Sequence, residues 1–299
     1  MPKTETPQPS PGRAATGSAS DAGGFGGRAL TPSESSETVP WYRRRSFERA
    51  LSVLSPILII AIWELGARAG VIDIRFFPAP SRIFQTFLEM LHPTEDYPRG
   101  ELLTHFGDSL GRIVIGFVLG AVPGIAIGLA MGLIGWVRAL IQPLVDGTYP
   151  IPKIAILPLF IMLLGIGEES KYAIIAVAVI YQVLINTVAG VRNIDRIYLD
   201  VGKNFHASRL MMFLDVALPG ALPVILTGLK LGMGVALLVI VSAEFVGAKS
   251  GIGYLIWSSW QVFQIEKMYV GLLLSATLGF GSAILLNYLE QKLVPWKPR

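Results

Sequence analysis

Apolar residues occur along the chain in runs long enough to cross a membrane. Ile113 to Val137 carries no charge between Arg112 and Arg138, and Tyr172 to Val191 is also free of charge. A helix needs about 20 predominantly apolar residues to cross the hydrocarbon core of a bilayer. Three further runs fit this requirement, two of them with a single interior charge: Ala50 to Ala67 (Glu64), Ala221 to Ala243 (Lys230) and Met268 to Leu289.

A sixth apolar segment, about Gly147 to Gly167, is interrupted by Lys153 and by three prolines, Pro150, Pro152 and Pro158. Irregular backbone at membrane depth is tolerated only where protein covers it or where it lines a cavity. We therefore expect a broken or kinked helix packed inside the protein. With this segment, the pattern predicts an all-α polytopic membrane protein with about six transmembrane helices.

The same pattern divides the chain into four parts. Residues 1–40 are rich in Pro, Ser, Thr, Gly and Ala, which predicts a disordered cytoplasmic tail. Residues 41–75 contain the first transmembrane helix. Residues 76–108 mix charges of both signs with apolar residues at helical spacing, which predicts an amphipathic periplasmic segment. Residues 109–295 form the core domain.

A cleaved signal peptide is the alternative interpretation of the first helix, because Ala67-Arg68-Ala69 has small residues at a suitable spacing. More than forty residues precede that helix, which favours an uncleaved anchor.

Basic residues orient the predicted spans. Three consecutive arginines, 43–45, precede the first helix and place the N-terminus in the cytoplasm, because loops on that side carry an excess of Lys and Arg. The loops 134–138 and 192–215 and the C-terminus are then cytoplasmic, whereas 165–171 and 244–267 are periplasmic. The expected location is a bacterial inner membrane.

Composition agrees with this fold class and excludes several functions. Of 299 residues, 52% are hydrophobic and 15% are charged, and the mean hydropathy is +0.56, whereas soluble domains carry roughly 25% charged residues. The absence of cysteine excludes disulfides, iron–sulfur clusters and thiol catalysis. A net charge of +4 without a basic and aromatic face gives no indication of nucleic-acid binding.

Catalytic motifs are also missing from the sequence. It has no Gly-x-x-x-x-Gly-Lys-Ser/Thr phosphate loop and no Gly-x-Ser-x-Gly elbow, so we expect this chain not to hydrolyse ATP and not to be an enzyme. His92, His105 and His206 have no zinc-binding spacing, and each is expected to be a surface residue. No metal site is predicted.

Polar residues at membrane depth are candidates for a pathway or a gate, because a charge there costs about 2.5–3.5 kcal/mol on insertion scales. Lys153 and Lys230 either attract an anion, reach towards the cytoplasmic surface or pair with a carboxylate. Gln182 and Asn186 share one face of a helix, where they line a polar pathway or bond between helices. Glu244, at the outer end of its helix, is a gate or docking candidate.

A stripe of glycines marks one face of the helix predicted over 113–137. Small residues at this spacing let helix backbones approach closely in lipid, where apolar burial gives no net drive. We expect packing against another helix of the same chain, and a contact between two copies of the chain is the alternative. The glycines recur at every fourth position: Gly116, Gly120, Gly124, Gly128 and Gly132.

The loop at 192–219 is the most informative segment. A short, polar, partly helical segment between two spans is unusual, and a transporter powered by separate ATPases needs a rigid protrusion that can be pushed. The loop resembles the EAA loop of ABC-importer permeases, which in that family forms the coupling helix that docks on the ATPase. The positions of this sequence that correspond to the family's loop are Asp200, Val201, Gly202, His206, Ala207, Ser208, Leu218 and Pro219.

Two positions depart from the family pattern. Asp200 stands where glutamate is usual and keeps the charge. His206 stands where glycine is usual and lacks the freedom of glycine to adopt a left-handed turn.

The resemblance covers about residues 76–290 and is closest to the nitrate/sulfonate/taurine permease branch. It implies a type I importer fold in which two permeases work with two ATPases, which bind ATP and magnesium, and with a periplasmic substrate-binding protein. No cofactor is expected in this chain. The motifs that carry the resemblance are Phe77-Pro78-Ala79-Pro80-Ser81, Ser109-Leu110 with Arg112, Gly116-Phe117, Pro150-Ile151-Pro152 with Leu157-Pro158, Gly165-Ile166-Gly167-Glu168 with Ser170-Lys171, Ala243-Glu244 and Gly251-Ile252-Gly253-Tyr254.

The resulting hypothesis is import of a small solute, such as a sulfonate, taurine or nitrate, by alternating access. A secondary transporter driven by an ion gradient is the first alternative, because it would also explain the spans, the broken segment and the buried charges. Such carriers commonly show internal repeats, and none is clear here. An intramembrane enzyme is the second alternative, but catalytic pairs at membrane depth are missing.

Overall fold

The computed structural model describes residues 45–208 and 211–296, and within these ranges it contains helices and no strand. The chain forms two compact units, Met1–Leu54 and Ser55–Arg299. Of the first unit, the structure describes only residues 45–54, which are the first turns of helix α1 (Arg45–Arg68). The tail predicted for residues 1–40 lies outside the described residues. Everything below concerns the second unit.

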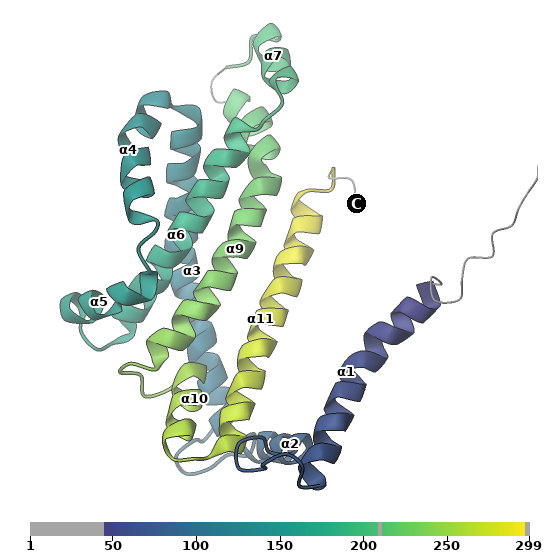
Figure 1. The fold of residues 1–299 in the computed structure, drawn as a ribbon. Coiled ribbons are helices and arrows are strands. Elements are labelled where there is room, and N and C mark those ends of the chain that lie inside the picture. Colours follow the sequence, from purple (N-terminus) through teal and green to yellow (C-terminus); the bar gives the residue numbers. More distant parts are fainter. Residues whose placement is uncertain (1–44, 209–210, 297–299) are drawn as a thin grey trace, which may run out of the picture. The chain divides into compact units, whose positions relative to one another are not determined.

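Four long helices build the second unit: α3 (Glu101–Leu133), α6 (Glu168–Arg192), α9 (Leu218–Glu244) and α11 (Ile265–Leu293) (Figure 1). Segment η3 (Met212–Ala217), which is π-helical, leads into α9 without a break. All four are long and apolar enough to cross a membrane, with mean hydropathies of 1.8 to 2.4 over their most apolar stretches. These helices confirm the predicted all-α polytopic fold.

A bent pair of helices forms the predicted broken span. Helix α4 (Gly135–Thr148) meets the stretch Lys153–Leu164, which consists of η2 (Lys153–Ile156) and α5 (Leu157–Leu164), at an angle of 90°. The prolines of the intervening connection lack the amide donor that a continuous helix needs. The helix therefore breaks at these prolines, as the sequence predicts.

The first half of this bent span begins earlier than predicted. Ile134 is extended, with φ −115° and ψ 107°, and it divides the apolar run Ile113 to Val137 between α3 and α4. Gly132 and Gly135 flank the break, and glycine is a weak helix former. A uniformly apolar sequence therefore contains one helix end and one helix start.

The described residues contain four candidate spans, or up to five if the bent pair counts as one. The first predicted span, Ala50 to Ala67, lies in α1 but is not among these candidates, so its crossing of the membrane stays a prediction. The boundary expected between residues 108 and 109 falls inside α3. The amphipathic helix expected before it is α2 (Pro80–Glu89), and the segment 244–267, expected as a loop, contains α10 (Ile252–Gln261).

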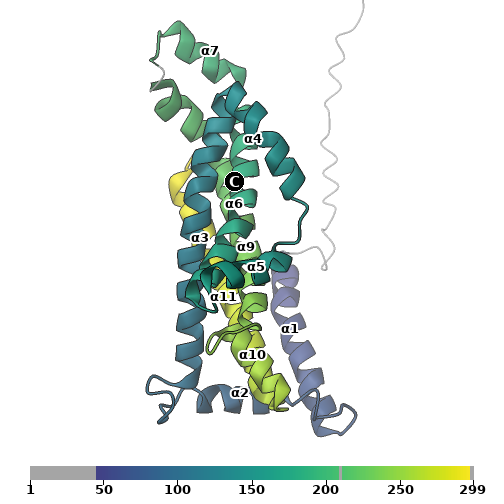
Figure 2. The ribbon, with the colours of Figure 1, turned by 90° about the vertical axis from the view of Figure 1, so that its left-hand side faces the viewer.

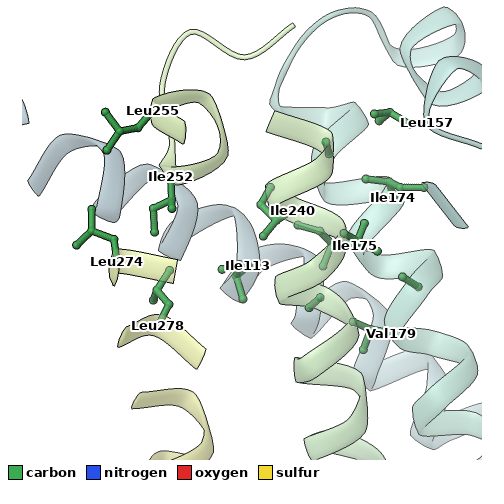
Figure 3. Packing of buried hydrophobic residues seen from close by; sticks show 14 of the residues in the cluster. Ile113, Leu157, Ile174, Ile175, Val179, Ile240, Ile252, Leu255, Leu274 and Leu278 are labelled. Carbon is green, nitrogen blue, oxygen red and sulfur yellow. The ribbon is translucent and has the colours of Figure 1, made fainter. Parts of the chain in front are cut away.

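The apolar core lies where α3, α6 and α9 pack together, and it extends to α10 and α11. Figure 3 shows how side chains from these helices meet. The labelled residues are buried, and they include Ile113 on α3, Ile175 on α6, Ile240 on α9, Leu255 on α10 and Leu274 on α11.

Helix α7 (Arg196–Asn204) lies at one end of this unit, whereas α2 and α10 lie at the opposite end in both views (Figures 1 and 2). We call these the α7 end and the α10 end. The α3–α4 connection and the C-terminal end of α11 point towards the α7 end, as the predicted set of cytoplasmic loops requires. That the α7 end faces the cytoplasm stays a prediction.

Candidate functional site

The predicted coupling loop, residues 192–219, contains the short helix α7. Its start is capped by Asp195, whose Oδ1 accepts a hydrogen bond from the amide of Ile197 at 3.0 Å. Asp200 and Val201 are exposed, whereas Gly202 is buried against the side chain of Met212 in η3. Helix α7 therefore exposes Asp200 together with large apolar side chains such as Ile197 and Tyr198. It packs, through Gly202, on the segment that leads into α9.

Helix α7 ends in a left-handed turn at His206, where φ is +52°. The amide of Ala207 donates to the carbonyl of Gly202 at 2.9 Å, which is the six-to-one hydrogen bond of a Schellman cap. A non-glycine residue in this conformation costs roughly 1–2 kcal/mol. The left-handed turn that glycine favours is therefore present here with histidine in its place.

The segment after this turn starts the next helix. The Oγ of Ser208 accepts a hydrogen bond from the amide of Met211 at 3.2 Å, and its carbonyl accepts one from the amide of Met212 at 2.8 Å. Leu218 and Pro219 are the first residues of α9, which continues η3 without a break. The hydrogen bonds of Ser208 and the contact of Gly202 with Met212 thus connect α7 to η3 and, through η3, to the long helix α9.

The glycine stripe of α3 lies against α6. A Cβ added at Gly120 would lie 2.4 Å from the carbonyl oxygen of Ala176, and a Cβ at each of the other four glycines would meet α6 at between 2.6 and 3.1 Å. Real Cβ atoms do not approach other atoms this closely without displacement. The contact that these glycines make in the described residues is therefore within one chain.

We expect Gly120→Ala to force α3 and α6 apart, because the obstacle is a backbone carbonyl that cannot rotate away. Overpacking of this kind costs typically about 1–3 kcal/mol, which thermal unfolding of the purified protein in detergent would measure. Gly111→Ala is the matched control on the same helix, since a Cβ there has nothing within 4 Å. Equal unfolding temperatures for the two variants would contradict the close contact.

A buried ionic cluster occupies the α10 end. Its centre is Glu244, the last residue of α9, which is 1% exposed. The carboxylate accepts hydrogen bonds from Ser109 Oγ at 2.7 Å, from Arg112 Nη1 at 2.8 Å and from the amide of Gly253 at 2.7 Å. Glu244 thereby joins the end of α9 to α3 and to the start of α10.

Arg112 uses every donor of its guanidinium. Nη1 also donates to the carbonyl of Ser250 at 2.7 Å, and Nη2 donates to Ser250 Oγ at 3.3 Å and to Glu168 Oε1 at 2.8 Å. Nε donates to the other carboxylate oxygen of Glu168. The side chain of Glu168 is 44% exposed and that of Glu244 is fully buried, so Arg112 has one accessible and one inaccessible carboxylate partner.

The charges of the cluster balance. Lys171 is buried beside Glu168, with its Nζ 2.9 Å from the carbonyl oxygen of Gly167 and 3.4 Å from Glu168 Oε1. Two cations, Arg112 and Lys171, therefore face two carboxylates, Glu168 and Glu244. A buried pair that is complete in this way avoids the large cost of an isolated charge.

The residues at the start of α10 pack closely against this cluster. Gly251 has φ +116°, and a Cβ there would lie 2.3 Å from Glu244 Oε1, so only glycine fits. Its amide donates to His105 Nδ1 at 3.1 Å, and the amide of Ile252 donates to Ser109 Oγ at 2.7 Å. His105 is 1% exposed, so the expectation that every histidine lies at the surface is wrong for this residue.

Two tyrosine rings flank His105, with centroids 5.5 Å away for Tyr97 and 5.9 Å away for Tyr254. Burial raises the pKa of Tyr97, which precedes α3, above its ordinary value. The phenol is therefore neutral at physiological pH.

The cluster brings together motifs that the sequence keeps far apart. Glu244 was a predicted gate or docking residue, whereas Ser109, Arg112 and Glu168 were noted only as motif residues. A signal for them exists: His105, Ser109 and Arg112 follow the helical spacing that leads to Gly116, the first glycine of the stripe. The buried face of α3 therefore continues from small residues into polar ones.

The other pathway candidates are not gathered at one place. Lys153 donates to the carbonyls of Thr148 at 2.8 Å and Tyr149 at 3.1 Å, and its Nζ lies 4.1 Å from the centre of the Tyr181 ring. This lysine therefore stabilises the break between α4 and η2. An aromatic face attracts a cation, so the contact with Tyr181 holds the ammonium near α6.

Lys230 pairs with Glu290 and Asn287 of α11. Of the three roles expected for this lysine, the structure therefore shows the pairing with a carboxylate. Asn186 donates to the carbonyl of Gln182 at 2.8 Å within α6. Its Cβ would lie 2.6 Å from a Cβ added at Gly228, so Asn186 faces α9. Within the described ranges, no group of three or more His, Cys, Asp or Glu side chains is placed to hold a metal ion.

Comparison with known proteins extends these observations. Residues 124–295 match the family model of the binding-protein-dependent transport system inner membrane component. The chain is 35% identical over 243 residues to the protein named as aliphatic sulfonates transport permease SsuC of Escherichia coli (strain K12), covering 81% of this chain and 90% of the relative. It is 33% identical over 267 residues to the protein of the same name in Bacillus subtilis (strain 168), covering 89% and 94%.

A third relative is the taurine transport system permease protein TauC of Escherichia coli (strain K12), 31% identical over 261 residues, or 87% of this chain and 94% of the relative. The helical fold, the α7 segment and these matches agree with the resemblance carried by the sequence motifs. The chain belongs to the family of binding-protein-dependent transport system inner membrane components.

Proposed function

We propose that this chain, an ABC-importer permease subunit, moves a small solute of the sulfonate, taurine or nitrate class across the bacterial inner membrane by alternating access. Membership of the family establishes a multi-pass membrane component that works with an ATPase and a substrate-binding protein. The substrate class rests on relatives whose names mention aliphatic sulfonates and taurine.

The observation that carries the proposed mechanism is the placement of α7. It lies at one end of the bundle, is capped at both ends, and is joined through Ser208 and η3 to the long helix α9. A short rigid helix in this position can pass a push from an ATPase into the membrane helices. Asp200, Val201 and the turn at His206 form the surface that docks on the ATPase.

The assembly contains two copies of this chain and two ATPases, which bind ATP and magnesium. The N-terminus and the α7 end face the cytoplasm, and the α10 end faces the periplasm. The glycine stripe holds α3 and α6 together, and α9 packs on α6 as closely at Gly228, so a displacement of α7 moves these helices as a group.

At the opposite end, the buried ionic cluster keeps the helices in place while α7 moves. Arg112 and Glu244 hold α3, α9 and the start of α10 together in a place that water does not reach. The hydrogen bond from Arg112 to the partly exposed Glu168 joins α6 and the preceding bent span to this cluster. We assign Glu244 a positioning role at the outer gate, because its carboxylate faces α3 and the 250–253 segment and is closed off from solvent.

Uptake by reconstituted proteoliposomes tests the proposal against an ion-gradient-driven carrier. We expect ATP-dependent uptake of taurine, an alkanesulfonate or nitrate when the permease, its ATPase and the loaded binding protein are all present. Liposomes with the permease alone, under imposed proton or sodium gradients, are the control and should take up none. Full uptake by the permease alone would refute the ABC mechanism.

A further inference from the structure

We infer that the turn after α10 is a docking surface for the substrate-binding protein, an assignment that rests on the proposed function. The surface consists of Trp260, Val262 and Phe263, and we call it the 260–263 patch. It lies at the α10 end, where α10 turns into α11 (Figure 2).

The backbone of Phe263 is in the left-handed region, with φ +57°. The amide of Phe263 donates to the carbonyl of Trp260 at 3.2 Å, and the amide of Gln264 donates to the carbonyl of Ser259 at 2.9 Å. The second bond is the six-to-one bond of a helix cap, in which glycine is the usual left-handed residue. A bulky aromatic residue with positive φ is a genuine outlier.

The side chain of Phe263 gains nothing from burial in this chain. It is 74% exposed, Val262 is 65% exposed and Trp260 is 51% exposed. Phenylalanine at position 263 therefore has an unfavourable backbone and an unfavourable exposure, and glycine would avoid both. Strain of this kind occurs where a residue serves a function, and here the exposed ring indicates a contact outside the chain.

The patch is presented on a rigid support. The Trp257 ring lies 5.2 Å from that of Phe245 and 5.0 Å from that of Trp260, measured between centroids, so three aromatic rings connect the patch to the end of α9. A Cβ at Gly271 would lie 2.6 Å from the side chain of Ile256, so α10 packs closely on α11. Fixed aromatic anchors are typical of the residues that dominate protein–protein binding energy.

The position of the patch indicates which protein it meets. The proposed ATPase contact is at the α7 end, and the patch is at the opposite end of the same helices. The family of this chain depends on a binding protein as well as an ATPase. In the proposed orientation the α10 end faces the periplasm, so we assign the partner at this end to the binding protein. Aromatic residues also occur at lipid interfaces, but a fluid lipid surface does not require one residue to keep a strained backbone.

Titration of the complex with its binding protein tests this inference. The permease and its ATPase are assembled in lipid nanodiscs, and ATP hydrolysis is measured against the concentration of the binding protein loaded with taurine or an alkanesulfonate. Phe263→Gly should raise the half-saturating concentration by about tenfold or more, because it removes an interface anchor. It should not lower the unfolding temperature, because it relieves the backbone.

Phe84→Ala is the matched control. Phe84 is an exposed aromatic residue of α2 at the same end, in ordinary helical backbone, and its variant should behave as wild type. An unchanged half-saturating concentration for Phe263→Gly would overturn the docking surface alone. Failure of the wild-type complex to respond to any of these loaded binding proteins would overturn the proposed function and the docking surface together.

A photoreactive benzophenone amino acid at position 263 separates protein from lipid without removing the ring. With the purified, loaded binding protein added to the nanodiscs, we expect a crosslink to that protein from position 263 and none from position 84. Crosslinking from position 263 to lipid alone would assign the patch to the membrane interface and overturn the inference.

Discussion

Reversing the charge at Asp200 is expected to abolish the stimulation of ATP hydrolysis by the loaded binding protein. Asp200 is exposed on α7, so Asp200→Arg leaves the apolar packing of the bundle intact and reverses a charge on the surface that α7 offers. Like charges facing each other across an interface cost several kcal/mol, which is enough to release the helix from the ATPase. ATPase assays of the reconstituted complex, with and without the loaded binding protein, measure the effect.

Asp200→Glu is the matched control, because it keeps the charge and restores the residue that is usual at this position in the resembling loop. The stimulated rate should fall to the basal rate for Asp200→Arg and stay near wild type for Asp200→Glu. Membrane insertion should be the same for both. Normal stimulation of the Asp200→Arg complex would exclude α7 as the coupling element.

Hydropathy predicts where helices run but not where an apolar run divides. The run Tyr172 to Val191 and the helix α6 (Glu168–Arg192) nearly coincide, because charges bound the apolar stretch on both sides. The run Ile113 to Val137 has no interior charge, yet the extended backbone at Ile134 ends α3 inside it. The helix break at Ile134 is therefore invisible in the hydropathy pattern, because the segments on both sides of it are apolar.

The start of α3 was missed for the opposite reason. Its first turns carry His105, Ser109 and Arg112, and a hydropathy scale treats such residues as facing water. All three are buried because each has a partner in the 244–253 segment or in Glu168. Arg112 and Glu244 are 132 positions apart, so no local pattern joins them.

Backbone strain is equally hidden from sequence reasoning. A positive φ is expected at glycine, but in the described residues it also occurs at His206 and Phe263. At His206 the comparison with a family pattern drew attention to the position, because glycine is usual there. Phe263 lies outside the motifs that carry the family resemblance, and only the structure reveals the strained backbone of this aromatic residue.

Removing the cation of the buried cluster is expected to have the second large effect. Arg112→Met would leave the carboxylate of Glu244 buried without a cation, whereas Glu168 is accessible enough to be hydrated. Breaking a buried pair by removing one partner costs about 3–5 kcal/mol. We expect a low yield of folded permease and a clearly lower unfolding temperature in detergent.

The double variant Arg112→Met/Glu244→Gln should recover part of this loss, because a neutral amide oxygen can still accept from Ser109 Oγ and from the amide of Gly253. Glu168→Gln is the matched control for loss of a carboxylate. It should lower the unfolding temperature little, since Arg112 keeps its partner Glu244 and the altered group is half exposed. Two results would contradict this explanation: Glu168→Gln destabilising the permease as much as Arg112→Met, or the double variant being no more stable than Arg112→Met. In either case an uncompensated charge at Glu244 would not cause the loss of stability. The apolar contacts around the cluster would then hold the helices together at the α10 end.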